Sequence, residues 1–295
     1  MNYPTSFRLP LVCVCLVIFS CSAATALAQT IFGLKSRASS TTSQPPTRLF
    51  SFLSDGTGFT DIGSITLGGV EIDADALGIS QINGSLRAFQ VTANGSTLLA
   101  INSSNGVATS IGLQLAGRDI RGAVFDSTDT FYTIDSAANE ILRIDPSSGL
   151  IVGAPIALTL GGSGFDVAET TDVAIRQDGV FYLVSGNSIY TLDPSTGVLT
   201  FAFGDSGQGL AGAAFSNIEN SLFAYEVNGT DDLFRYATGS GFSRSTVLEN
   251  IIPGYNAGRG DLAAARVPES GSSFVLLLAA LGALAFFQVR SSGRV

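Results

Sequence analysis

A short apolar segment recurs five times along the chain, at intervals in the forties. Each copy is four residues long, and the copies begin at Leu49, Leu98, Ile141, Ile189 and Leu233. The intervals between these starts are 49, 43, 48 and 44 residues. A period of this length, built from short strands and turns, is typical of a β-propeller, in which each repeat is one four-stranded blade.

The other strands of a blade can be placed around each copy. A second apolar strand precedes it, at residues 86–89, 131–134, 181–184 and 222–225. Before that lies a segment rich in Gly and Ala, at residues 77–79, 123–125, 173–175 and 213–215, which suits an inner strand crowded around an axis. Outer strands are expected at residues 107–111, 150–156, 198–203 and 245–248. Each repeat therefore contains four strands in order from the axis to the rim.

The first repeat lacks its inner strand. Residues 31–34, 49–52 and 62–67 supply its second, third and fourth strands, and the missing strand is found at the far end of the chain, at residues 261–264. Pairing these two ends closes the ring and leaves no open sheet edge. The sequence thus predicts an all-β, five-bladed β-propeller closed by its C-terminal strand.

A β-sandwich is the alternative fold, because regularly spaced short strands with turn signals fit it too. The period in the forties and the split first repeat favour the propeller. Residues 36–47 are rich in Ser, Thr and Pro, and their composition cannot bury an apolar face. We expect a mobile surface loop there.

Composition removes several classes of function. The chain carries a net charge of −9, which disfavours binding to nucleic acid. Its three cysteines are Cys13, Cys15 and Cys21, and it contains no His and no Trp. The part after residue 28 can therefore form no disulfide, Ser-His-Asp triad, or zinc site made from Cys or His.

Residues 1–28 have the order of a secretory signal. Arg8 is followed by an apolar run over residues 9–19 and then by small residues that end at Ala28. This order predicts a signal helix and cleavage by signal peptidase between Ala28 and Gln29. The alternative is a lipoprotein signal acylated at Cys21, although Phe19 is bulkier than the residue usual at its position.

The other end contains an uncharged apolar run over residues 274–289, followed by Arg290 and Arg294. Such a run predicts a short transmembrane helix with its C-terminus in the cytoplasm. The alternative, a buried core helix, is disfavoured because nothing downstream would cover it. The domains expected are a signal peptide (1–28), a propeller (29–266) and a C-terminal segment (267–295).

The C-terminal segment begins with Val267, Pro268, Glu269, Ser270 and Gly271. With the apolar run and the arginines, this motif resembles the tripartite sorting signal of PEP-CTERM proteins, in its Val-Pro-Asp-Ser-Gly variant. Glu269 replaces the Asp of that variant, and the basic cluster is thin. The resemblance covers about 29 residues. It implies a surface protein whose tail is processed by an exosortase-type transpeptidase, often in organisms that make exopolysaccharide.

Two Asp-Pro-Ser segments, starting at Asp145 and Asp193, invite a catalytic or metal-binding interpretation. They are better explained as turns. The Asp side chain accepts hydrogen bonds from turn amides, Pro fixes φ, and Gly149 and Gly197 take a positive φ at the exit.

Glu71, Asp73 and Asp75 alternate along the chain and would share one face if this segment is a single strand. Three carboxylates there could hold calcium, which prefers oxygen ligands. The segment lacks the Gly and the distal Glu of a calcium loop, so a solvated rim is the favoured interpretation. We expect no other cofactor.

Asp172 and Asp261 start two of the predicted inner strands at equivalent positions, and Arg121 and Arg259 lie nearby in the pattern. These four residues are the candidates for a ligand site at one mouth of the channel. Two carboxylates could serve as acid and base in glycoside hydrolysis. Alternatively, they bind backbone amides of neighbouring blades and fix the ring.

The sequence therefore predicts an exported, surface-anchored propeller that acts as a binding or structural module of the envelope or extracellular matrix. Exopolysaccharide or surface proteins are its expected partners. The competing hypothesis is an extracellular glycosidase or a metal-dependent lactonase that uses carboxylates at the channel mouth. If it is an enzyme, Asp172 and Asp261 should meet a further carboxylate in a deep, open pocket.

Overall fold

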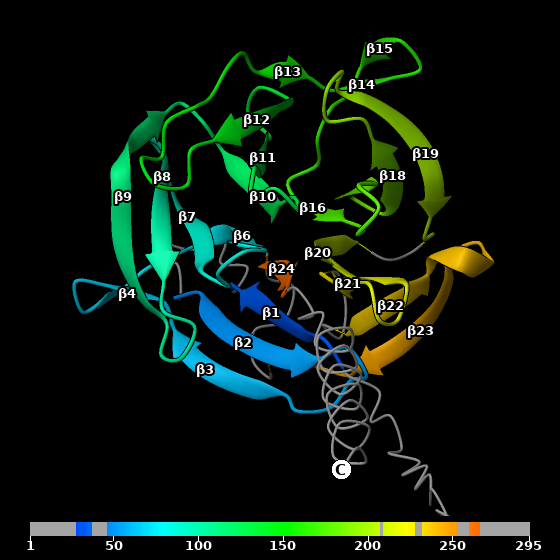
Figure 1. Ribbon diagram of the computed structural model, residues 1–295, viewed down its shortest axis with the longest axis horizontal. Coiled ribbons are helices and arrows are strands. Elements are labelled where there is room, and N and C mark those ends of the chain that lie inside the picture. The colour runs from blue at the N-terminus through cyan, green and yellow to red at the C-terminus, as the bar shows by residue number, and fades with distance from the viewer. Residues whose placement is uncertain (1–27, 37–45, 207–208, 228–231, 253–259, 266–295) are drawn as a thin grey trace, which may run out of the picture.

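Five sheets stand around a common axis in the computed structural model, which describes residues 28–36, 46–206, 209–227, 232–252 and 260–265 (Figure 1). The sheets form a ring rather than two packed layers. The prediction of an all-β, five-bladed propeller is confirmed, and the β-sandwich alternative is wrong.

Each sheet runs outward from the axis. The innermost strands are β24 (Gly260–Ala264), β6 (Asp75–Ile79), β10 (Ile120–Phe125), β16 (Thr171–Ile175) and β20 (Leu210–Ser216). The second strands are β1 (Thr30–Lys35), β7 (Leu86–Thr92), β11 (Phe131–Asp135), β17 (Phe181–Ser185) and β21 (Ser221–Glu226). Blades 1 to 5 are numbered in this order.

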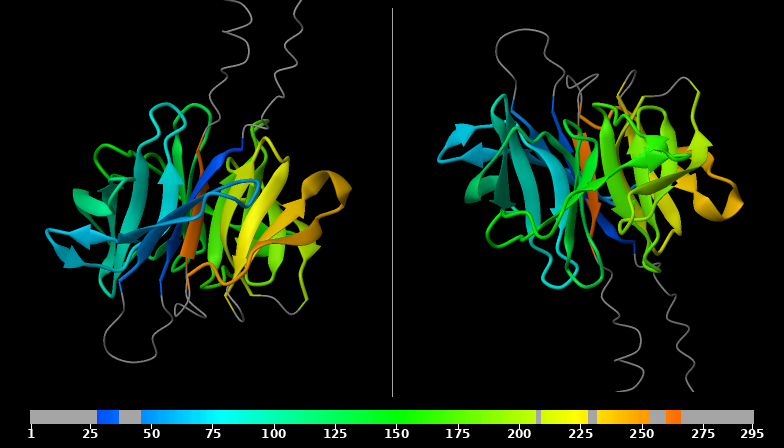
Figure 2. Two further views of the ribbon diagram at one scale, coloured as in Figure 1. Left: turned by 90° about the horizontal axis from the view of Figure 1, so that it is seen from below. Right: turned by 90° about the horizontal axis from the view of Figure 1, so that it is seen from above.

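The third strands contain the recurring segment. They are β2 (Arg48–Leu53), β8 (Gly95–Ile101), β12 (Glu140–Ile144), β18 (Ser188–Leu192) and β22 (Leu233–Ala237). The outer strands are β3 (Thr60–Ser64), β9 (Val107–Ala116), β13 (Ile156–Ala157), β19 (Val198–Gly204) and β23 (Ser243–Leu248), the last preceded by the 3-10 helix η1 (Thr238–Ser240). In the side views the strands cross the disc, so the turns gather on its two faces (Figure 2).

The two ends of the described chain complete one blade together. Strand β24 pairs antiparallel with β1, from Ile31 opposite Ala264 to Lys35 opposite Gly260. This is the closure that the split first repeat predicts. Because β24 also contacts β6 and β20 of the neighbouring blades, both sides of the closing strand are covered.

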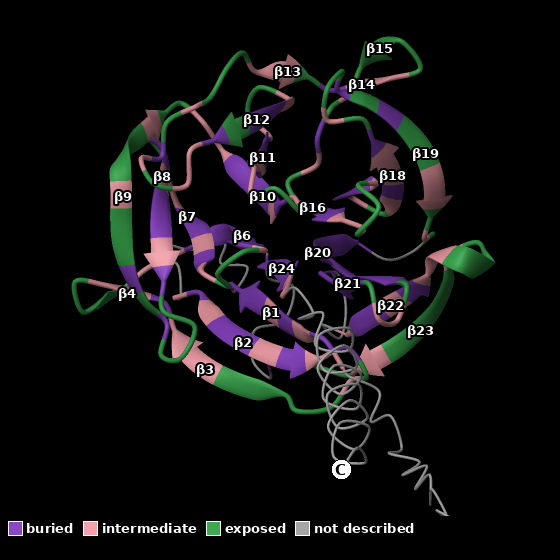
Figure 3. Cartoon of the chain, viewed as in Figure 1, coloured by how far each residue is buried: buried purple, intermediate pink, exposed green. Residues whose placement is uncertain are grey.

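The core consists of five apolar clusters, each between two adjacent blades. Alternate side chains of a strand point to opposite faces of its sheet, so every blade supplies apolar residues to both neighbours. Burial is greatest on the strands near the axis, whereas exposed residues lie on outer strands such as β9, β19 and β23 (Figure 3). The small residues expected near the axis, among them Ala123, Ala174 and Ala213, are at most 1% exposed.

Two hairpins extend from one blade onto the outer edge of the next. They are β4 (Thr66–Leu67) with β5 (Val70–Glu71), and β14 (Thr159–Leu160) with β15 (Ser163–Gly164). Strand β4 pairs in parallel with β9 and strand β14 with β19. Both hairpins contain Thr-Leu-Gly-Gly, and both glycines have a positive φ in each case, as a tight hairpin turn requires.

The hairpins correct two predicted outer strands. Strand β3 ends at Ser64, because Thr66 and Leu67, expected in the outer strand of blade 1, pair with blade 2 instead. In blade 3 the expected strand over residues 150–156 is reduced to a bridge between Ile144 and Ile151 and to the two-residue strand β13. In both places the chain leaves its own blade for a hairpin on the outer edge of the next blade, so the outer strand stays short.

The predicted loop over residues 36–47 is wrong at its ends. Ser36 is 5% exposed and Thr47 is fully buried. The Thr47 hydroxyl donates to Asp73 Oδ1 at 2.7 Å and accepts from the Ala74 amide at 2.9 Å, so it ties blade 1 to the start of blade 2. Residues 37–45 lie outside the described part of the chain.

The expected signal helix, the sorting motif at residues 267–271 and the apolar run at residues 274–289 also lie outside the described residues. Within the residues that are described, no helix is long and apolar enough to cross a membrane.

Candidate functional site

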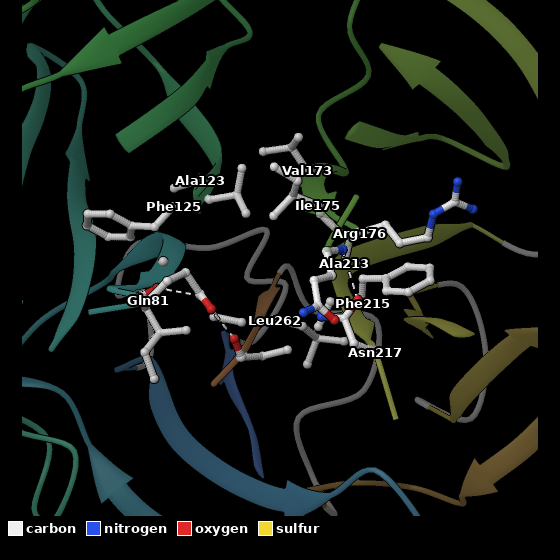
Figure 4. A pocket seen from close by; sticks show the side chains of 18 of the residues that line it. Gln81, Ala123, Phe125, Val173, Ile175, Arg176, Ala213, Phe215, Asn217 and Leu262 are labelled. Carbon is white, nitrogen blue, oxygen red and sulfur yellow. Dashed lines mark hydrogen bonds between the residues drawn. The ribbon is translucent and has the colours of Figure 1, made fainter. Parts of the chain in front are cut away.

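A cavity of about 250 Å³ opens on the axis, at the face where the innermost strands of blades 2 to 5 turn into the second strands and where β24 ends (Figure 4). We call this cavity the funnel. Its described lining consists of Gln29, Gly78, Ile79, Gln81, Ala123, Val124, Phe125, Ser127, Val173, Ala174, Ile175, Arg176, Gln177, Gly179, Ala213, Ala214, Phe215, Asn217, Leu262, Ala263 and Ala264. Its wall is therefore formed by the ends of all five innermost strands.

Five neutral polar side chains stand at the mouth of the funnel, one from each blade. Four of them lie two residues after the last apolar residue of an inner strand, and the fifth precedes β1; they are Gln81, Ser127, Gln177, Asn217 and Gln29. Four are carboxamides and one is a hydroxyl, so every member can both donate and accept a hydrogen bond.

Side-chain hydrogen bonds connect part of this polar ring to the closing strand. Gln29 Nε2 donates to the carbonyl of Ala265 at 2.5 Å, and Gln29 Oε1 accepts from the backbone amide of Asn217 at 3.0 Å. Gln81 Nε2 donates to the carbonyls of Ile79 and Ala264, at 2.9 and 3.4 Å. These bonds hold the rim in place.

Two members of the ring are not used in this way. The backbone amide of Gln177 donates to Asn217 Oδ1 at 2.9 Å, but the Gln177 side chain and the Ser127 hydroxyl make no hydrogen bond within the described residues. Both residues are exposed at the mouth. Their polar groups are therefore free to bind a ligand.

The floor of the funnel is small and tightly packed. A Cβ built on Gly78 would lie 2.7 Å from Phe131 Cε2, so glycine is required where β6 meets blade 3. Phe125 and Phe215 line the wall but are at most 3% exposed, and Ala123, Val173, Ala213 and Leu262 are just as buried. The apolar surface open to the cavity comes from partly exposed residues such as Val124, Ile175 and Ala264.

Asp172 and Asp261, the candidates for a channel mouth, lie on the axis beyond the floor and are fully buried. Neither lines the funnel, although the next residues, Val173 and Leu262, do. The two carboxyl groups are hydrogen-bonded to each other, which requires a proton on one of them.

Their remaining hydrogen bonds go to backbone amides. Asp172 Oδ2 accepts from the amides of Ala213 and Leu262, and Asp172 Oδ1 accepts from its neighbour Val173 at 2.6 Å. Asp261 Oδ2 accepts from the Leu77 amide. The pair thus joins β6, β16, β20 and β24. This arrangement matches the alternative stated from the sequence, in which the two carboxylates bind backbone amides of neighbouring blades and fix the ring.

Burial raises the pKa of both carboxyl groups, and the charge of Asp172 raises the pKa of Asp261 further. A third carboxylate lies near this pair. Asp75, at the start of β6, is 7% exposed, and burial raises its pKa to about 6 although Arg121 opposes the shift. Its charge in turn raises the pKa of Asp261.

The Arg121 guanidinium is paired with carboxylates and does not line the funnel. Its guanidinium donates to Asp75 Oδ2 at 3.1 Å and to Asp119 Oδ2 at 2.8 Å. Arg118, three residues earlier, pairs with Asp135 and Glu140 at 2.7 and 2.5 Å. Arg259, the fourth mouth candidate, lies outside the described residues.

A second cavity, of about 530 Å³, opens on the opposite face and is lined in part by Asp73, Arg118, Asp119 and Arg121. Each of its two arginines is already shared between two carboxylates. Asp73 accepts from the Thr47 hydroxyl, so the four charged side chains that line this cavity all have partners among the described residues.

The three calcium candidates do not lie along one strand. Glu71 is exposed at the end of β5, Asp73 follows it and accepts from Thr47, and Asp75 begins β6 and pairs with Arg121. The expectation of one continuous face is wrong, because the chain leaves a hairpin and enters an inner strand within these five residues. In the described part of the chain, no group of three acidic, His or Cys side chains is placed to hold a metal ion.

The Asp-Pro-Ser segments are turns, as predicted. Asp145 Oδ1 accepts from the amide and the hydroxyl of Ser147, at 2.9 and 2.7 Å. Asp193 makes the same pair of bonds with Ser195. Hydrogen bonds from Ser147 and Ser148 lower the pKa of Asp145 to about 2.

The polar ring is not among the candidates predicted from the sequence, because those ligand and metal candidates are all charged residues. The signal was available: once the inner strands are aligned, the residue two positions after each one is neutral and polar in four blades. The position of Gln29 could be found only from the closure, which brings the start of β1 beside the end of β24.

The chain is similar in fold to several solved structures. A chain of a nidogen/laminin complex matches with a TM-score of 0.50 at 10% identity, covering 80% of this chain and 98% of that chain. TolB from Acinetobacter baumannii matches with a TM-score of 0.48 at 14% identity (81% and 67%), and virginiamycin B lyase from Staphylococcus aureus with 0.41 at 15% (72% and 69%). No family model and no curated protein sequence matches. These likenesses concern the fold alone.

Proposed function

We propose that this protein is an exported binding module of the cell surface or extracellular matrix, and that the funnel is its ligand site. The observation that carries the proposal is the ring of five neutral polar side chains, one from each blade, around a mouth on the axis. Ligand sites are typically concave and largely apolar, with a few convergent polar groups. The funnel has this composition.

The carboxylates favour binding over catalysis. Hydrolysis of a glycoside needs two carboxyl groups on either side of the bond that breaks. Asp172 and Asp261 instead accept backbone amides, bind each other and have no exposed surface. We therefore propose that they hold the ring together and that the protein turns over neither glycans nor lactones.

Export and attachment rest on the two ends of the sequence. The secretory order of residues 1–28 supports cleavage by signal peptidase after Ala28. The motif from Val267 to Gly271, the apolar run and the terminal arginines support recognition by an exosortase-type transpeptidase. Exopolysaccharide or other surface components are the proposed partners.

Binding is tested by filling the mouth of the funnel. The exported protein should be retained on isolated envelope or matrix material, and Ser127→Trp should abolish the retention. Ser103→Trp is the matched control, because Ser103 is also an exposed serine, lies in the turn before β9 and does not line the funnel. Equal retention of both variants would show that the funnel is not the site. Turnover of a glycan or lactone that Asp172→Asn abolishes would support the enzyme instead.

Attachment is tested separately with an epitope tag after Val295. The exported protein should keep a propeller epitope and lose the tag, and replacement of residues 267–271 by a Gly-Ser stretch of equal length should preserve the tag. A tag that stays attached to the unmodified, surface-exposed protein would contradict processing at this motif.

A further inference from the structure

We propose that the ligand of the funnel is neutral and rich in hydroxyl groups, and has the size of one sugar ring, either free or at the end of a neutral polysaccharide. This proposal rests on the proposed binding function and specifies the chemistry of its ligand. It follows from the charge, the hydrogen-bonding capacity and the size of the cavity.

The charge of the funnel lining favours a neutral ligand. Arg176 is the one charged residue in the described lining, and its guanidinium points away from the cavity (Figure 4). It forms two hydrogen bonds with Asp178, at 2.8 and 2.7 Å, and donates to the Tyr182 hydroxyl at 2.9 Å. An anionic or cationic ligand would therefore give up its hydration without meeting a free opposite charge, which is costly.

The polar ring matches hydroxyl groups. A carboxamide offers an acceptor oxygen and two donor hydrogens, and a serine hydroxyl offers both functions, as each hydroxyl of a sugar does. The side-chain polar groups of Gln177 and Ser127 make no hydrogen bond among the described residues. Asn217 lies between Gln177 and Gln29: its side-chain Oδ1 accepts from the Gln177 backbone amide, and its own backbone amide donates to Gln29 Oε1. Because these residues belong to different blades, they approach the axis from different directions.

The size and the apolar wall of the funnel also fit a sugar ring. A volume of about 250 Å³ lies just below the ~300–1,000 Å³ of sites for drug-sized molecules, so the funnel suits a small ring. Partly exposed wall residues such as Val124, Ile175 and Ala264 offer apolar contact to the C–H groups of such a ring. A purely apolar molecule would fill the cavity but leave the polar rim unpaired, which lowers its affinity.

The test is a titration of the exported protein, followed by calorimetry and by ligand-observed NMR. The probes are glucose, galactose, mannose and N-acetylglucosamine as neutral sugars, glucuronate as an acidic sugar and glucosamine as a basic sugar. At least one neutral sugar should bind more tightly than both charged sugars. Gln177→Ala and Ser127→Ala should each weaken this binding about two- to tenfold, the loss expected for one hydrogen bond. Ser103→Ala should leave it unchanged.

The outcomes separate this proposal from the binding function. Preferred binding of glucuronate or glucosamine would overturn the ligand class while leaving the funnel as the site. Loss of envelope retention in Ser127→Trp, without binding of any neutral sugar, would do the same. Neutral-sugar binding that Gln177→Ala and Ser127→Ala do not weaken would place the sugar elsewhere and overturn the proposal. Equal retention of Ser127→Trp and Ser103→Trp would instead overturn the binding function of the funnel.

Discussion

Gly197 illustrates how a single turn residue also sets the distance between two blades. Its φ is +73°, and a Cβ at this position would lie 2.1 Å from the carbonyl oxygen of Ala157 in the preceding blade. The Gly197 carbonyl accepts a hydrogen bond from the Thr159 amide at 2.9 Å, at the point where the β14–β15 hairpin joins the outer edge of blade 4. Glycine is therefore needed both for the backbone angle and for the close approach.

We expect Gly197→Ala to destabilise the protein by about 2 kcal/mol or more, because strain at positive φ is combined with a clash against backbone. Gly241→Ala is the matched control. Gly241 has a φ of +74° but no atom within 4 Å of the built Cβ, so its substitution should cost only about 1 kcal/mol. Urea unfolding measures both. Equal losses of stability in the two variants would show that the close contact of Gly197 with blade 3 adds nothing to the cost of the substitution.

The buried carboxyl groups on the axis predict an unusual dependence of stability on pH. Asp75 has a pKa of about 6 in the folded protein, against about 3.9 in an unfolded chain. Between these values the folded state binds more protons than the unfolded state, so the free energy of unfolding falls as the pH rises. Asp172 and Asp261, whose pKa values are also raised, act in the same direction.

Urea unfolding from pH 4 to pH 8 should show this fall in the free energy of unfolding. The loss due to Asp75 should be on the order of 3 kcal/mol and should be complete by about pH 7. Below pH 4 stability should fall again, because groups with a lowered pKa such as Asp145 lose their charge. Asp75→Asn should flatten the slope between pH 4 and pH 6. A wild-type stability that rises from pH 5 to pH 7 would contradict the buried, protonated state of this cluster.

At the scale of the strand, closure of the ring depends on β24. This strand supplies five residue pairs with β1, places Leu262 in the core between blades 5 and 1, and carries Asp261 to the axis. Without it the inner edge of β1 would be exposed, and an exposed strand edge promotes aggregation.

Two truncations that differ only at this end test the role of β24. A chain of residues 29–265 should be monomeric and melt cooperatively, because it contains every described strand and core residue. A chain of residues 29–252 should elute as aggregates and lose its cooperative transition. Circular dichroism and size-exclusion chromatography measure both properties. Equal melting temperatures for the two chains would contradict closure by β24.

The sequence predicted those strands whose apolar pattern repeats, and it failed where glycines redirect the chain. The inner, second and third strands could be aligned from their apolar residues, and the closure followed from the missing strand of blade 1. The hairpins could not, because Thr66–Leu67 and Thr159–Leu160 look like ordinary strand residues and nothing local distinguishes pairing with the next blade from pairing with their own. None of the predicted ligand candidates that the structure describes lines the funnel, since Asp172 and Asp261 are buried among backbone amides while the polar residues at the mouth of the funnel are uncharged.

At the scale of the whole molecule, the last described residues of the chain lie at the funnel. Ala264 lines the funnel, and Ala265 binds Gln29 at its rim. Eight residues, 266–273, separate this point from the apolar run that starts at Phe274. Even fully extended, they span at most about 28 Å. If the apolar run is inserted in a membrane, the funnel must face that membrane closely.

This arrangement predicts a fixed orientation, which single-cysteine labelling can measure because all native cysteines precede residue 22. Ser127→Cys places a fluorophore on the funnel face, and Ala137→Cys places one beside the second cavity on the opposite face. In liposomes that contain an acceptor-labelled lipid, the protein with its tail intact should transfer energy more efficiently from position 127 than from position 137. Removal of residues 267–295 should abolish the difference. Stronger transfer from position 137 would mean that the funnel points away from the membrane, and that its ligand is not drawn from the layer next to the cell.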